Sequence, residues 1–139
     1  MRNSKASAEW SGVLKSGKGA MSVGGQTFPF TFNSRMEGGA GSSPEELLAG
    51  ALAGCFSMAL SADLEKAGFP SEQVTTNAVG HFDNATGKWT LEKIDLDISA
   101  KVANIDNAKF QEIAKGTSSA CPVSRALTGV KINVNAKLV

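Results

Sequence analysis

The chain has 139 residues, enough for one domain with a real hydrophobic core and no need of disulfide staples. Its 14 basic and 13 acidic residues nearly cancel, which argues against binding nucleic acid or an acidic membrane surface. The first ten residues lack the apolar core of a signal peptide. We therefore expect a single cytoplasmic domain over residues 1–139, with both of its cysteines reduced.

Alternating apolar and polar residues predict strands in the first third of the chain. Residues 6–15 and 18–23 are expected to form a hairpin, with the turn at Ser16–Gly19. Residues 28–32 follow as a strand, and Pro29 places it at a sheet edge or a strand start.

The stretch from Gly12 to Gly19, GVLKSGKG, comes close to a phosphate-binding loop. Its eighth position is glycine, so the hydroxyl that would hold magnesium is missing. The stretch also lies in a predicted hairpin rather than between a strand and a helix. We interpret it as a turn.

A long helix is predicted over residues 44–66, with Ser43 as its N-cap. The fourteen residues from Leu47 to Leu60 carry no charge, and a bilayer needs about 20. A helix that is apolar on all sides must be buried, so we expect it at the centre of the core. Gly50 and Gly54, one turn apart, indicate close contact with another helix, such as its own copy in a second subunit.

The rest of the chain mixes strands and helices in blocks, which predicts an α+β fold with antiparallel sheets around the long helix. The expected elements are a strand at 74–82, a strand at 94–102, a helix from Asn104 or Asp106 to about residues 115–116, a short helix between Cys121 and Gly129, and a strand at 130–138.

Cys55 and Cys121 are the candidates for chemistry. A lone buried cysteine is most often a small apolar residue, and Cys55 lies in the middle of the apolar helix. Cys121 stands at a helix N-terminus, where the helix dipole and free N–H groups lower the pKa of a thiol. Cys55 is reactive only with a cation beside it, such as Arg35, which Glu45 or Glu46 would orient. Physical chemistry alone therefore ranks Cys121 as the more acidic thiol.

One histidine, His81, and two cysteines are too few ligands for a closed tetrahedral metal site. We expect no metal and no other cofactor. A Cys–His nucleophile pair has no local motif in its support, so a surface or half-buried histidine is the preferred interpretation of His81.

Several short motifs occur in order along nearly the whole chain. They are Trp10–Lys15 with Gly17–Gly19, Arg35–Gly38, Ser43–Leu47, Ala53–Leu60 and Cys121–Ser124. Together they resemble the OsmC/Ohr family of thiol peroxidases, and the OsmC branch in particular.

The resemblance implies an intertwined α+β homodimer with active sites at the subunit interface. It implies that Cys55 is the peroxidatic thiol and Cys121 the resolving thiol. Arg35 would activate the thiolate, and Glu45 would orient the arginine. The implied partners are a hydroperoxide substrate and an external dithiol reductant, which in the family is of the lipoyl type. The sequence itself does not select such a dithiol over thioredoxin or glutathione. No role for nucleic acid or membrane is implied. The apolar composition around these residues further predicts a pocket favouring organic peroxides, shaped by Phe56, Met58, Met36 and the phenylalanines of 28–32.

Glu45 and Cys55 are ten residues apart, about 15 Å along a straight helix. Both cannot contact one arginine head group unless the helix breaks at Gly50 or two subunits share each site. We favour the second arrangement, in which Arg35 and Glu45 of one chain complete the cysteine site of the other.

Two other interpretations stay open at this point. The same cysteines could serve an apolar-ligand-binding or redox-sensing protein without turnover. They could also be inert residues of the core.

Overall fold

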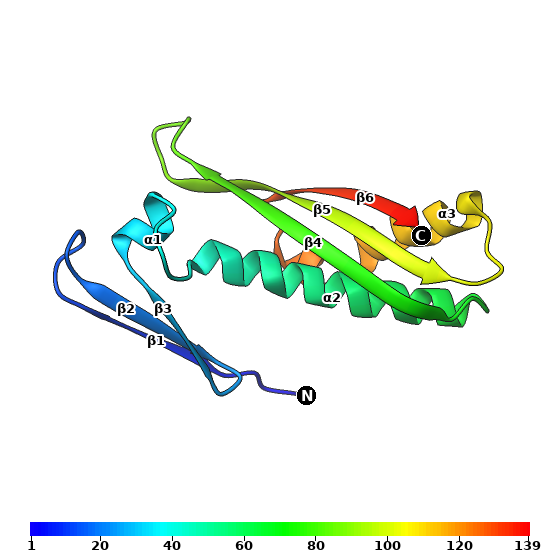
Figure 1. Cartoon of the computed structure of the whole chain (residues 1–139), viewed down its shortest axis with the longest axis horizontal. Helices are drawn as coiled ribbons and strands as arrows, with labels where there is room; N and C mark the ends of the chain where they lie inside the picture. Colours follow the sequence, from blue (N-terminus) through cyan, green and yellow to red (C-terminus); the bar gives the residue numbers. More distant parts are fainter. The chain divides into compact units, whose positions relative to one another are not determined.

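A computed structural model describes all of residues 1–139. It contains helices as well as two small sheets, which confirms the α+β class (Figure 1). The chain forms two compact units, residues 1–47 and 48–139, whose boundary falls inside the long helix. In chain order the elements are β1 (Ala6–Ser11), β2 (Lys18–Val23), β3 (Gln26–Phe30), α1 (Phe32–Met36), α2 (Pro44–Lys66), β4 (Ser71–Asp83), β5 (Thr90–Val102), α3 (Asn107–Ala120), α4 (Pro122–Ala126) and β6 (Lys131–Leu138).

The first unit is built on an antiparallel sheet in the order β1-β2-β3. The predicted hairpin of β1 and β2 is confirmed, although β1 ends at Ser11 and residues 13–16 form the turn. β3 is an edge strand, as predicted from Pro29. A proline is tolerated in such a strand because its missing N–H costs nothing on the side that pairs with no other strand.

A short helix, α1, follows β3 and was not predicted. The alternation over residues 28–32 predicted a strand as far as Phe32, but Thr31 ends the strand by capping α1. The Ser34 N–H donates to Thr31 Oγ1 at 3.1 Å, and the Thr31 N–H donates to Ser34 Oγ at 2.8 Å. This reciprocal capping box gives the helix a defined start and fixes the direction of the residues it carries, including Arg35.

Helix α2 runs without a break from Pro44 to Lys66, as predicted. At its start Ser43 Oγ accepts the N–H of Glu46 at 3.1 Å. It ends at Gly68, whose φ of +90° suits a residue without a Cβ. By length and composition alone α2 is apolar enough to span a membrane, properties that a core helix shares.

Only one face of α2 is buried within the chain. The buried residues recur every three or four positions and are Ala49, Leu52, Phe56, Leu60 and Leu64. On the other side Leu48 is 41% exposed and Met58 is 75% exposed. The expectation of burial on all sides is thus met on one face, and the second face is an apolar surface of the chain.

The second unit holds a sheet in the order β4-β5-β6. β4 and β5 are antiparallel, but β5 and β6 are parallel, so the prediction of purely antiparallel sheets is wrong here. The reason is the connection: α3 and α4 form a crossover between β5 and β6, which a parallel pair requires. α3 also runs past its predicted end, because Thr117 continues it and donates its hydroxyl to the Ile113 carbonyl and to Asp63.

One face of this sheet forms the core of the second unit. Ile94, Leu96 and Ile98 of β5 are buried with the apolar stripe of α2 and with Phe110 of α3. Figure 1 shows α2 lying along the sheet. Burial of this apolar surface is the main favourable term in the stability of the unit.

The other face of the sheet is polar and pins the parallel register. Asn133 of β6 donates to Asp95 of β5 at 2.6 Å, and Asn135 donates to Asp97 at 2.9 Å. His81 is half-buried, as predicted, and its Nε2 lies 2.6 Å from Asp95 Oδ2. The hydrogen bonds from Asn133 and then His81 hold the pKa of Asp95 below its ordinary value.

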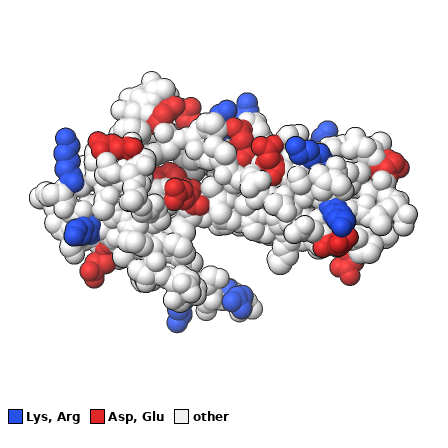
Figure 2. Space-filling model, viewed as in Figure 1, with Lys and Arg blue, Asp and Glu red and all other residues white.

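Charged side chains are interspersed on the surface. On the face in Figure 2 acidic and basic side chains are scattered among uncharged area, in places next to each other, and neither sign forms a continuous patch. This pattern matches the formal net charge of +1.

The core of the second unit makes a stability prediction. Leu64→Ala removes a fully buried side chain and should lower the free energy of unfolding by about 2–5 kcal/mol. Val79→Ala, at a position 57% exposed, is the matched control and should change it by less than about 0.5 kcal/mol. Urea unfolding measures both, and equal losses would contradict the assignment of this core.

Candidate active site

The two cysteines, 66 positions apart, lie side by side in the second unit. Their sulfurs are 3.1 Å apart and hydrogen-bonded, and both thiols are reduced. Cys55 comes from the middle of α2, where it packs against the core. Cys121 is 1% exposed and is the N-cap residue of α4. A disulfide needs the sulfurs to approach to about 2.05 Å, a shift of roughly 1 Å.

The two thiols differ in acidity. Burial raises the pKa of Cys55, and the hydrogen bond with Cys121 raises it further. Burial also acts to raise the pKa of Cys121, but hydrogen bonds outweigh it and lower that pKa. The groups that would stabilise its thiolate are the Ser124 N–H, the Cys55 thiol, the Ser124 hydroxyl and the Val123 N–H. The lowered pKa of Cys121 agrees in direction with its place at a helix N-terminus.

Arg35 and Glu45 form a second pair, in the first unit. Arg35 Nη2 lies 2.7 Å from Glu45 Oε1, and Arg35 Nε lies 3.1 and 3.2 Å from the two carboxylate oxygens. The Glu45 side chain is 13% exposed and that of Arg35 is 37% exposed. Such a fork fixes the direction of a guanidinium far better than a single contact does.

Hydrogen bonds hold the glycine loop between α1 and α2 in a position that lets Arg35 and Glu45 pair. The Ser42 N–H and hydroxyl both donate to the Pro29 carbonyl, at 2.9 and 2.8 Å. Ser34 Oγ donates to the Ser42 carbonyl at 2.9 Å. These bonds tie the start of α2 to the end of β3, and they set Glu45 opposite Arg35.

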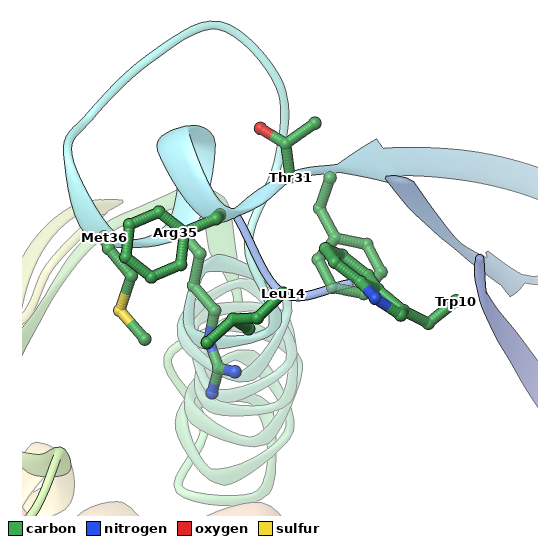
Figure 3. Close-up of a pocket in the computed structure, with 7 residues that line it drawn as sticks. Trp10, Leu14, Thr31, Arg35 and Met36 are labelled. Carbon is green, nitrogen blue, oxygen red and sulfur yellow. The ribbon is translucent and has the colours of Figure 1, made fainter. Parts of the chain in front are cut away.

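An apolar pocket of about 310 Å³ lies in the first unit beside Arg35 (Figure 3). In Figure 3 the Arg35 side chain extends between Met36 and Leu14, with Trp10 across the pocket. The lining residues are Trp10, Leu14, Phe30, Thr31, Phe32, Arg35 and Met36. One cation in an apolar wall suits a molecule with an apolar body and a polar head.

Trp10 is held in place by the turn that resembled a phosphate-binding loop. Its indole Nε1 donates to the Gly12 carbonyl at 3.0 Å, and its ring lies 5.5 Å from that of Phe30. A Cβ added at Gly19 would come within 2.6 Å of both rings, and one at Gly17 within 2.9 Å of Trp10. The glycines thus make room for aromatic side chains, which supports the interpretation as a turn.

Comparison with known proteins identifies the family. The model of the OsmC-like protein family matches residues 37–135. Peroxiredoxin OsmC of Escherichia coli is 39% identical over 126 residues, which cover 88% of each chain. The chain belongs to the OsmC-like family.

Solved structures confirm the OsmC-like fold. The OsmC-like protein of Mycoplasma pneumoniae superposes with a TM-score of 0.77 at 20% identity, over 99% of this chain and 98% of its own. The organic hydroperoxide resistance protein OhrB of Bacillus subtilis gives a TM-score of 0.65 at 23% identity, over 96% and 98%. The resemblance that the sequence motifs indicated is therefore confirmed.

The predicted site residues of this OsmC-like protein form two pairs, Cys55 with Cys121 and Arg35 with Glu45. The alternative of a helix broken at Gly50 is wrong, because α2 is continuous. Ten residues of helix separate Glu45 from Cys55 by about 15 Å along the axis.

The predicted pocket residues of this OsmC-like protein are correct only in part. Met36, Phe30 and Phe32 line the pocket, whereas Phe56 is fully buried in the core of the second unit and Met58 is exposed on α2. Trp10 and Leu14 were not predicted as pocket residues. No local sequence pattern places them there, because the path of the turn that carries them depends on close packing at Gly17 and Gly19.

His81 does not pair with a cysteine in this OsmC-like protein. Its ring is bonded to Asp95 on the outer face of the sheet, whereas the cysteines pack with the inner face. No group of three or more His, Cys, Asp or Glu side chains is arranged to hold a metal ion.

Proposed function

We propose that this OsmC-like protein is a thiol peroxidase that reduces organic hydroperoxides to alcohols, and hydrogen peroxide less efficiently. The observation that carries the proposal is the pair of reduced thiols with sulfurs 3.1 Å apart, close enough for one to resolve the oxidised form of the other. The peroxiredoxin relative at 39% identity supports the enzyme class, and the name of the Bacillus subtilis OhrB supports the substrate class.

In the proposed reaction the Cys55 thiolate attacks the terminal oxygen of the hydroperoxide. The oxygen–oxygen bond breaks, the alkoxide takes a proton and leaves as an alcohol, and Cys55 becomes a sulfenic acid. Cys121 then attacks the Cys55 sulfur, which forms a disulfide and releases water. The disulfide protects Cys55 from irreversible oxidation.

The pKa shifts of the two thiols in the second unit oppose these roles, because the pKa of the attacking Cys55 is raised and that of Cys121 is lowered. Cys55 therefore requires another group that stabilises its thiolate. Within that unit the pKa of Cys55 is raised by burial and by Cys121. A guanidinium within about 4–6 Å of a thiolate favours the charged form. We propose that Arg35 supplies this charge and also stabilises the negative charge that develops on the leaving oxygen.

We further propose a homodimer in which Arg35 and Glu45 of one chain complete the Cys55–Cys121 site of the other. The supporting facts are the continuous α2 and the exposed apolar face of that helix, which includes Leu48 and Met58. A contiguous apolar surface on a helix is typical of a protein contact. Sedimentation of a fully active monomer would contradict this proposal.

The pocket beside Arg35 is the proposed site for the organic part of the substrate. Its volume of about 310 Å³ and its aromatic lining suit an aryl or alkyl group. Hydrogen peroxide gains nothing from these walls, so binding energy should favour the organic substrate.

An external dithiol of the lipoyl type is the proposed reductant, and no cofactor is proposed. The dithiol reduces the Cys55–Cys121 bond by exchange. We propose that residues 1–139 act as a single functional domain. We place the enzyme in the cytoplasm, because that compartment keeps thiols reduced and a catalytic thiol pair has to be reduced again after each turnover.

The cysteine roles make a prediction about turnover. Cys55→Ser should abolish consumption of cumene hydroperoxide with dihydrolipoamide, because the attacking sulfur is gone. Cys121→Ser should form one equivalent of sulfenic acid, trapped by dimedone, and then turn over poorly.

The reverse pattern in the two variants would overturn the assignment of roles. A wild-type protein that consumed one equivalent of peroxide and stopped would indicate a redox sensor rather than an enzyme. Unchanged behaviour in both variants would indicate inert cysteines.

The pocket makes a prediction about specificity. Trp10→Ala should lower kcat/KM for cumene hydroperoxide by about tenfold, since losing an aromatic wall costs on the order of 1–2 kcal/mol of binding. It should leave the value for hydrogen peroxide nearly unchanged.

Trp89→Ala is the matched control, because Trp89 is the other tryptophan and packs on Phe82 in the second unit. Equal losses for both peroxides in Trp10→Ala, or a wild type that prefers hydrogen peroxide, would rule out this pocket as the substrate site.

A further inference from the structure

The segment after the buried thiol carries a polar group that the mechanism above does not use. Ser124 Oγ is buried and has no hydrogen-bond partner in the protein. An unsatisfied buried hydroxyl costs about 1–3 kcal/mol, so its retention calls for an explanation. Removing it should not destabilise the reduced protein.

The position of Ser124 in α4 supplies the explanation. Cys121 is the N-cap residue of this helix and makes no side-chain capping bond, and Ser124 stands three residues later. Side chains at the N-cap and at the third helical position lie close together, as in a capping box. The Ser124 hydroxyl and N–H both lie within hydrogen-bonding range of the Cys121 sulfur when it is a thiolate.

We propose that Ser124 is a positioning residue that stabilises Cys121 as a thiolate, so that Cys121 is both the nucleophile in resolution and the leaving group in reduction. The hydroxyl has no acceptor while Cys121 is protonated and donates to it once the proton is lost. The four-residue sequence Cys-Pro-Val-Ser thus places a hydroxyl where a Cys-x-x-Cys motif has its second thiol. The proposal rests on the proposed function.

Two steps of the cycle use this thiolate. In resolution the Cys121 thiolate attacks the Cys55 sulfenic acid: a sulfur–sulfur bond forms, the sulfur–oxygen bond breaks, and hydroxide leaves with a proton as water. In reduction a thiolate of the external dithiol attacks Cys55, and the electron pair of the protein disulfide passes to Cys121. The second thiol of the dithiol then displaces Cys55 and closes the external disulfide.

Stabilising the Cys121 thiolate directs the second step. In thiol exchange the sulfur with the lower thiol pKa is the better leaving group. Cys121 is also 1% exposed, whereas Cys55 is half-buried. Both factors send the reductant to Cys55 and release Cys121.

The test measures the acidity of Cys121 without peroxide. In a Cys55→Ala background, where Cys121 is the only cysteine, the ultraviolet absorbance of its thiolate is followed against pH. Adding Ser124→Ala should raise the midpoint by about one pH unit, because a hydrogen bond to a charged group is lost. Ser124→Thr, which keeps the hydroxyl, should restore the midpoint. Ser119→Ala is the control, an exposed serine of α3.

A second measurement follows the catalytic step in the otherwise wild-type chain. Ser124→Ala should slow closure of the disulfide about tenfold below the pKa of Cys121 and so prolong the dimedone-reactive state of Cys55. The first attack on peroxide should be unaffected by comparison.

An unchanged midpoint in Ser124→Ala, or an equal rise in Ser119→Ala, would overturn the role of Ser124. The two proposals fail separately. A shifted midpoint in a protein that does not consume peroxide would leave the role of Ser124 standing and reject the peroxidase. Turnover with an unshifted midpoint would reject Ser124 alone.

Discussion

The continuity of α2 constrains everything else in the site. An unbroken helix from Pro44 to Lys66 holds Glu45 near its first turn and Cys55 in its middle. The helical rise keeps these residues about 15 Å apart along the axis, whatever the side chains do. Since Glu45 holds Arg35 by a forked ion pair, the cation is tied to the start of the helix. This separation is the main support for the proposed site shared between two chains.

The thiol pair shows why a second copy would matter chemically. Left to the second unit alone, burial disfavours the Cys55 thiolate, and hydrogen bonds at the start of α4 favour that of Cys121. A lowered pKa suits Cys121 as the resolving thiol, whereas a raised pKa does not suit Cys55 as the attacking thiol. In the proposed dimer, Arg35 of the other chain would offset the raised pKa of Cys55. In this account dimerisation is a condition for catalysis, because it brings the charge to the nucleophile.

Several features of the fold were predictable from local sequence rules. The bounds of α2 followed from the N-cap serine and the terminal glycine, and the hairpin of β1 and β2 followed from its alternation. The parallel pairing of β5 and β6 did not follow, because a strand with one apolar face looks the same in either direction. α1 was missed since its five residues are set by the capping bond of Thr31, not by a periodic pattern.

The two pairs of candidate site residues were more predictable from the sequence than the pocket beside them. Both pairs of residues were named from motifs, and the structure brings each pair into contact. The aromatic pocket was only half foreseen, because Trp10 and Leu14 reach it through a turn whose path depends on close packing at Gly17 and Gly19. Ser124 was overlooked because burial of one hydroxyl next to a thiol is a property of packing.

The central claim, a site shared between two chains, is tested most directly by mixing two inactive variants. Arg35→Ala and Cys55→Ser chains are unfolded together, refolded together and assayed with cumene hydroperoxide. If sites are shared, each hybrid dimer has one complete site, and the mixture should recover about a quarter of wild-type activity. If the mixture is no more active than the separate variants, Arg35 does not serve the Cys55 of the other chain, and the account is contradicted.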